Sequence, residues 1–235
     1  MKKLNKKEYK IQLDEIKDIS PIPQLKSDPN RLLEFKLLLD QLFKIMVDYK
    51  LDYGMKWLLG LESYIHDKEN RPTKFNKHLE RGHVILVELF GHYNRELTFE
   101  HPAVVLYDEM TDEGKGEGWI LIAPISTPSY GNNNPLHIDL DENDGLKHEC
   151  AARVDSIKVI DKRRVLYQYS KDEQNVKIRH NKLDEIDQAI LENYLPNTFT
   201  KNKDLKIALE NERNNHNKTK AELELLKQQV RVPTT

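Results

Sequence analysis

The sequence has little of what marks a secreted, membrane-bound or metal-rich protein. Its 235 residues include one cysteine, Cys150, which excludes a disulfide framework and a Cys-rich zinc site. No apolar run approaches the roughly 20 residues that span a bilayer; one of the longest is Trp119 to Ile125. The Lys-rich start, Met1 to Lys10, has no apolar segment behind it, so no signal peptide is expected. We therefore expect a cytoplasmic protein without a membrane partner.

An excess of charge of one sign is also lacking. The chain carries 37 Lys and Arg against 39 Asp and Glu, a formal net charge of −2. This balance argues against a protein whose whole surface binds nucleic acid. The length predicts one or two domains and allows at least one substantial core.

The common catalytic and cofactor motifs are missing. The sequence has no Gly-rich phosphate-binding loop, no His-Glu-x-x-His and no Gly-x-Ser-x-Gly. The nine His are scattered without ligand spacing, so no metal and no cofactor are predicted. Cys150 falls in an apparent strand, where a small core residue is the more common interpretation than a nucleophile.

Residues 1–75 are predicted to be a helical N-terminal extension. Asp28-Pro29 is a helix start, with Asp as the N-cap and Pro at the first helical position. Apolar residues then recur every three or four positions up to Tyr49, which places them on one helical stripe. A second helix is predicted from about Met55 until just before Arg71-Pro72. The leucine stripe is interpreted as core or as a partner-binding surface.

Residues 76–196 change to a β-rich pattern. Short apolar runs separated by Gly-, Asn- and Pro-bearing segments predict a compact antiparallel barrel. The predicted strands are 84–90, 103–107, 119–125, 137–140, 150–154 and 156–160. A helix over 182–194 closes this zone, with Pro196 as its stop.

Residues 197–235 are predicted to be a polar tail, either helical or disordered. Its broken heptad of apolar residues is interrupted by Asn211 to Asn217. A weak coiled coil or a partner helix is the most that this pattern supports.

Arg153 and Asp155 are the charged pair with the clearest chemical potential. On a strand, residues i and i+2 point to the same face, so the two side chains are expected to lie together. One interpretation is an ordinary half-exposed salt bridge. The other is proton transfer on a phosphodiester, with one group taking a proton while a cation stabilises the phosphorane.

The order of the motifs resembles the MazF/PemK (Kid) family of toxins. Arg81-Gly82-His83-Val84 resembles the family's first strand, and a Gly-bearing loop then leads to His101-Pro102-Ala103-Val104-Val105. Pro124-Ile125-Ser126-Thr127 and the segment from Val154 to Val165 resemble later family motifs. The resemblance covers about 77–194.

The resemblance implies an α+β fold, a small SH3-like antiparallel β-barrel with a C-terminal helix, here preceded by the helical extension. It further implies a homodimeric, sequence-selective endoribonuclease of a type II toxin–antitoxin system. Such an enzyme cleaves single-stranded RNA, including mRNA, by attack of the 2′-OH, leaving a cyclic phosphate and a 5′-OH. A cognate antitoxin protein is the implied partner, with DNA contacted only through that antitoxin.

The catalytic residues implied by the resemblance are Arg153, Asp155 and His92, with His101 and Ser126 at the positions of a second branch of the family. Asp155 would be the base toward the 2′-OH, Arg153 would stabilise the phosphorane, and His92 would assist. Predicted RNA-binding residues come mainly from loops, where aromatic and polar side chains meet unstacked bases. They are Tyr93, Asn94, Arg95, Phe99, Thr127, Tyr130, Asn132, Asn133 and Lys158.

Two departures from the family pattern support an alternative. His101 stands where the family has Arg, and Lys158 stands where Arg is frequent, so a bidentate phosphate donor is lost at each position. The alternative function is a catalytically inactive MazF-like barrel that binds nucleic acid or protein.

Overall fold

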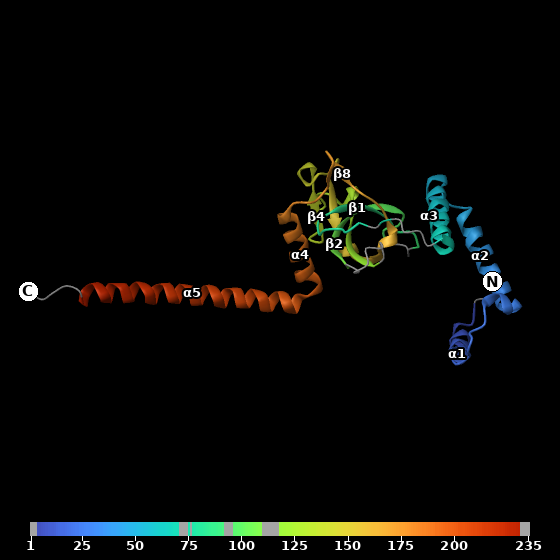
Figure 1. Ribbon diagram of the computed structural model, residues 1–235, viewed down its shortest axis with the longest axis horizontal. Coiled ribbons are helices and arrows are strands. Elements are labelled where there is room, and N and C mark those ends of the chain that lie inside the picture. Colours follow the sequence, from blue (N-terminus) through green and yellow to red (C-terminus); the bar gives the residue numbers. More distant parts are fainter. Residues whose placement is uncertain (1–3, 71–74, 76, 92–95, 110–117, 231–235) are drawn as a thin grey trace, which may run out of the picture. The chain divides into compact units, whose positions relative to one another are not determined.

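The computed structural model describes residues 4–70, 75, 77–91, 96–109 and 118–230. The chain divides into two compact units, Met1–Leu59 and Gly60–Thr235. Each unit is described here by itself, and Figure 1 labels the elements.

The first unit contains α1 (Lys6–Lys17), α2 (Pro29–Met46) and the start of α3 (Leu51–Asn70). Asp28 caps α2 as predicted, because its carboxylate accepts from the N–H groups of Asn30 and Arg31. α1 was not predicted, since its polar sequence hides the apolar stripe. Neither α1 nor α2 contains a buried residue. Much of the leucine stripe of α2 is exposed, so this unit has no core of the usual kind.

The second unit is built on an antiparallel sheet. Its strands are β1 (Val84–Glu88), β2 (Glu100–Asp108), β3 (Trp119–Ser126), β4 (His137–Leu140), β5 (Cys150–Arg153), β6 (Lys158–Asp161) and β7 (Val165–Gln168). Their order is β4-β5-β3-β2-β1-β7, with β6 also paired to β3. A small hairpin of β8 (Ser170–Lys171) and β9 (Gln174–Asn175) follows. The α+β class is confirmed, while closure of the sheet into a barrel stays a prediction.

The central strands are buried on both faces. Val104 and Leu106 of β2 belong to one core cluster, whereas Ala103 and Val105 belong to the other. Side chains alternate between the faces of a strand, so a strand covered on both sides is apolar at nearly every position. This double coverage explains the uninterrupted apolar runs in the sequence.

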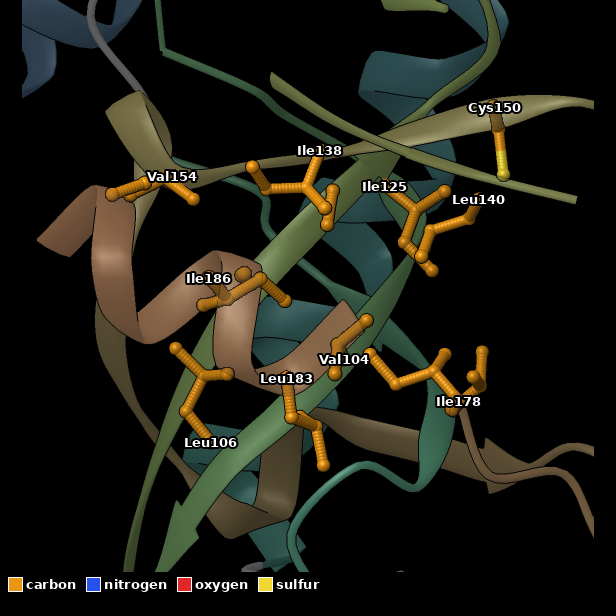
Figure 2. Packing of buried hydrophobic residues seen from close by; sticks show 14 of the residues in the cluster. Val104, Leu106, Ile125, Ile138, Leu140, Cys150, Val154, Ile178, Leu183 and Ile186 are labelled. Carbon is orange, nitrogen blue, oxygen red and sulfur yellow. The ribbon is translucent and has the colours of Figure 1, made fainter. Parts of the chain in front are cut away.

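Helix α4 (His180–Tyr194) covers one of these faces. Figure 2 shows Leu183 and Ile186 on the side of α4 that faces Val104 and Leu106. The helix predicted over 182–194 is therefore confirmed, and it ends before Pro196 as expected.

Pro196 also begins the next helix, α5 (Pro196–Val230), since proline is tolerated in the first helical turn. Of the two states predicted for the tail, helical or disordered, the structure has the helix, and α5 continues through Asn211 to Asn217, where the apolar heptad is interrupted. Each Asn lowers helix propensity only modestly, and the flanking Lys, Glu and Leu are strong helix formers. Among the helices that the structure describes, none is both long enough and apolar enough to cross a membrane.

Candidate active site

The candidate site begins at a tight turn after β5. The predicted strand 150–154 ends at Arg153, and Val154–Ser156 form a 3-10 turn, so strand alternation is not what aligns Arg153 with Asp155. Val154 is fully buried, its N–H donates to Leu136 O at 2.8 Å, and its carbonyl accepts from the Tyr194 hydroxyl at 3.0 Å. Figure 2 shows Val154 beside α4. The buried residue anchors the turn between two outward-facing charged side chains.

Arg153 and Asp155 form a two-pronged ion pair. Arg153 Nε donates to Asp155 Oδ1 at 3.0 Å, and its terminal Nη2 donates to Oδ2 at 2.7 Å. The Ser156 hydroxyl adds a contact to Oδ1 at 3.2 Å. Parallel bonds of this kind are among the strongest and most directional that a carboxylate makes.

His137 joins this pair from the neighbouring strand. It is the register partner of Arg153 in the β4–β5 ladder, and its Nε2 lies 3.3 Å from Asp155 Oδ2. Its side chain is only 8% exposed. Sequence reasoning did not select His137, because only the pairing of β4 with β5 brings it to Asp155. No local pattern in the sequence specifies that register.

The pKa of the Asp155 carboxyl is set by opposing effects. Partial burial raises the pKa, but hydrogen bonds from Arg153 and then His137 lower it, and the net shift is downward. Asp155 is therefore a carboxylate at neutral pH, with hydrogen-bond donors on both oxygens.

The alternative positions, His101 and Ser126, lie on adjacent strands. The β2–β3 ladder ends at the pair of Ala103 with Pro124, and His101 and Ser126 each lie two residues beyond that pair. Ser126 lies opposite Ala151, two residues from Arg153 on β5. Residues directly opposite share a face of the sheet, as do residues i and i+2. Ser126 is thus on the same face as Arg153.

Thr127 lines a pocket of about 590 Å³ between the start of β2 and the end of β3. The pocket wall also includes Pro102, Lys147, His148 and Tyr169.

Of the remaining predicted residues, Tyr130 and Asn132 lie on the loop before β4, whereas Phe99 and Lys158 lie elsewhere. The Asn132 side chain contacts the His137 ring, and the Tyr130 hydroxyl bonds Glu149 at 3.3 Å. Phe99 is 9% exposed, an arrangement that offers no ring face to a base. Lys158 of β6 lies opposite Ile122 of β3, and burial lowers the pKa of the Lys158 ammonium group.

The loop residues His92, Tyr93, Asn94 and Arg95 lie outside the described residues.

A second bidentate Arg–Asp ion pair lies elsewhere in this unit. We call Arg153–Asp155 the first fork and Arg163–Asp161 the second fork. Arg163 Nε and Nη2 donate to Asp161 at 3.1 and 2.9 Å, and these side chains are 29% and 34% exposed. A bidentate Arg–Asp pair is therefore not diagnostic of chemistry by itself. The first fork differs from the second in having a buried histidine beside the carboxylate.

Within the described ranges, no group of three or more His, Cys, Asp or Glu side chains is arranged to hold a metal ion. Cys150 is buried, and burial with the nearby Asp144 and Asp139 raises its pKa to about 11. Its thiol is protonated at neutral pH, as expected for a core residue.

Comparison with known proteins identifies a family for residues 80–194 within the second unit. Residues 80–194 match the family model described as "PemK-like, MazF-like toxin of type II toxin-antitoxin system". No curated protein matches the chain.

Solved structures with similarity include MazF (Form-I) from Deinococcus radiodurans, at 18% identity over 49% of this chain and 96% of that one, with a TM-score of 0.38. Mycobacterium tuberculosis toxin MazF-mt6 matches at 14% identity over 47% and 93%, with a TM-score of 0.33. A MazE-MazF structure (Form-II) from Deinococcus radiodurans matches at 18% identity over 48% and 93%, with a TM-score of 0.35. The assignment rests on the family model.

Proposed function

We propose, from the premise that residues 80–194 are a PemK/MazF-like toxin domain, that this protein is a metal-independent, sequence-selective endoribonuclease and the toxin of a type II toxin–antitoxin pair. The observation that carries the proposal is the cluster of Arg153, Asp155 and His137 inside this domain. The cluster sets a carboxylate, a permanent cation and an imidazole within hydrogen-bond distance of one another.

In the proposed reaction, a ribose 2′-OH of single-stranded RNA attacks the adjacent phosphorus. Asp155 accepts the 2′-OH proton as the O2′–P bond forms, and the P–O5′ bond then breaks. Arg153 stabilises the negative charge of the phosphorane, which is the task a fixed cation performs best. The leaving oxygen gains one proton from His92 or solvent, so the products are a cyclic phosphate and a 5′-OH, with no water consumed.

RNA would cross the face of the sheet that carries Arg153 and Ser126. Thr127 and the pocket beside it offer a place for one unstacked base on the opposite face, the face of Ile125 and Cys150. Tyr130 and Asn132 lie on the loop that leads to His137. Tyr93, Asn94, Arg95 and Lys158 complete the proposed RNA-binding set. Because the chain has a net charge of −2, the contacts to RNA phosphates would depend on a few local cations such as Arg153, Arg95 and Lys158. These contacts would weaken as the salt concentration rises.

The proposed partners are a second copy of the chain and an antitoxin. One similar solved structure is of a MazE-MazF complex, which supports a protein inhibitor for this domain as well. Contact with DNA would occur only through that inhibitor.

The second candidate is a catalytically inactive domain that binds nucleic acid or protein. His101 and Lys158 favour it, since each stands where an Arg would provide a bidentate phosphate donor.

The deciding experiment is incubation of the purified protein with a long single-stranded RNA in EDTA. We expect discrete fragments with 5′-OH ends from wild type, and a loss of at least about 100-fold in Asp155→Asn, the range that acid–base groups contribute. Wild-type protein that is folded, free of inhibitor and inactive on several RNAs would favour the binding domain.

The second fork supplies the matched control. Asp161→Asn makes the same chemical change in a pair of nearly the same geometry, and its cleavage rate should stay within about two-fold of wild type. Equal losses in both variants would indicate a general effect on folding and contradict the assignment to Asp155.

A further inference from the structure

His137 is a nearly buried titratable side chain in contact with Asp155, and the reaction described above gives it no task. We infer that His137 is a positioning residue, whose Nε2–H donates to Asp155 Oδ2 and, together with Arg153, fixes the orientation and ionisation of that carboxylate. The inference rests on the proposed function only in its effect on catalysis; the hydrogen bond itself can be tested without RNA.

The tautomer of His137 follows from the loop before β4. Asn132 Oδ1 accepts the backbone N–H of Asn134 at 3.1 Å, which fixes the orientation of the Asn132 amide. Its Nδ2 then faces His137 Nδ1 at 2.8 Å as a donor. A nitrogen that accepts a hydrogen bond carries no proton in the neutral ring, so the ring proton is on Nε2, the atom that faces Asp155.

Two competing contacts point the other way. His137 Nδ1 also lies 3.2 Å from Asn132 Oδ1, but that oxygen already accepts the Asn134 N–H, and the Asn132 Nδ2 contact to the same ring nitrogen is shorter at 2.8 Å. Asn134 Nδ2 lies 3.3 Å from His137 Nε2, and a bond there would require a lone pair on that nitrogen. The carboxylate decides between the two, because a lone pair facing an ionised oxygen is repulsive, whereas an N–H donor is charge-assisted. The shorter Asn132 contact agrees with this choice.

The surroundings make His137 well placed to influence Asp155. Among the described residues, the charged or titratable groups that face the carboxylate are Arg153 and His137. The contacts from the preceding loop come from neutral amides. Asp161 in the second fork has the arginine without a histidine. It also accepts the Arg163 backbone N–H, and Arg164 further lowers its pKa, so it is a reference for a carboxylate that is paired with arginine and not contacted by histidine.

The experiment compares wild type with His137→Ala, His137→Gln and the control His180→Ala, which changes an exposed histidine at the start of α4. Carboxyl ¹³C NMR of the full chain follows the titration of Asp155 and Asp161. We expect the pKa of Asp155 to rise in His137→Ala, to return toward wild type in His137→Gln, which keeps an N–H donor, and to stay fixed in His180→Ala. Asp161 should titrate alike in all four proteins.

The same proteins are then assayed for RNA cleavage against pH. We expect kcat of His137→Ala to fall about 10-fold with KM nearly unchanged, and the acid limb of the profile to move in the direction of the Asp155 titration. A role limited to packing would lower stability without moving that limb.

Asn132→Leu provides a second variant at an exposed loop position, in case His137→Ala fails to fold. Without the Asn132 amide, Nδ1 can carry the proton, so the pKa of Asp155 should again rise. An Asp155 titration that is unchanged in the His137 and Asn132 variants would overturn the inference and leave the proposed function standing. Wild-type protein without cleavage would refute the nuclease, while the NMR titration would still decide whether His137 bonds Asp155.

Discussion

At the scale of single residues, the neighbours of an ion pair determine the role that we assign to it. Arg153–Asp155 and Arg163–Asp161 share the same chemistry and nearly the same bond lengths. Only the first has a histidine whose side chain is 8% exposed at the carboxylate. A third carboxylate, Asp144, is also paired with an arginine, Arg179, and this pair stabilises the fold.

Asp144 should make stability depend on pH. Its side chain is fully buried, and Arg179 donates to it from its backbone N–H, Nε and Nη2. Burial raises its pKa, but the bonds from Arg179 and the Asp141 N–H outweigh burial, so the pKa lies below its ordinary 3.8. The stabilisation is therefore present above about pH 3.8 and is lost as the pH falls through the lower folded value.

We expect Asp144→Asn to lower the free energy of unfolding at pH 7 by about 3 kcal/mol, since it leaves Arg179 without its buried partner. Urea denaturation from pH 7 down to pH 3 measures this, and the gap to wild type should shrink only at the acid end. Asp184→Asn on the exposed side of α4 should change stability by less than about 0.5 kcal/mol. A gap that is constant across the whole range would contradict the linkage.

At the scale of elements, the second unit depends on close packing between segments far apart in sequence. The part of α3 that belongs to this unit contacts Phe90, just after the end of β1, at Gly60. A Cβ on Gly60 would lie 2.3 Å from Phe90 Cδ2 and 3.0 Å from its Cβ. The absence of a side chain at this position is what permits the contact.

Gly60→Ala should therefore destabilise the protein by about 1–3 kcal/mol, the usual penalty for overpacking. Gly54→Ala is the matched control in the same helix, because the nearest atom to its Cβ would be 4.0 Å away. Gly54→Ala should be neutral or stabilise by up to about 1 kcal/mol, since alanine favours helix. Thermal unfolding measures both, and equal effects would show that α3 does not pack on Phe90.

At the scale of the whole molecule, the two units differ in how they bury apolar surface. Every buried hydrophobic residue in the described parts of the chain lies at or after Phe75. The helices α1 and α2 bury none, and large side chains such as Phe43 remain 67% exposed. The second unit is therefore expected to fold without the first.

Removing residues 1–59 should leave the unfolding midpoint of the second unit within about 4 °C, the shift that about 1 kcal/mol produces at this size. Circular dichroism of 60–235 beside the full chain measures it. Loss of cooperative unfolding would show that the core needs the N-terminal helices.

We also propose that the flanking helices serve docking or inhibition. An unchanged oligomeric state and unchanged RNA cleavage after removal of 1–75 would count against this proposal.

Local pattern determined much of the architecture. The Asp28-Pro29 cap, the apolar runs of β2 and β3 and the stripe of α4 were all predictable, because each depends on residues within a few positions of one another. Weak or polar patterns hid α1 and β7, and they left the tail that forms α5 open between helix and disorder. Arg153 and Asp155 were predictable as neighbours in sequence, although the turn that joins them was not.

Tertiary structure alone decided what surrounds that pair. His137 is 18 residues from Asp155, and the register of β4 with β5 brings them together. The burial of Phe99 and the placement of Lys158 on a different part of the sheet were equally invisible to local pattern. Contacts between distant segments depend on strand pairing and on which faces are covered, and a single sequence specifies these only through the fold as a whole.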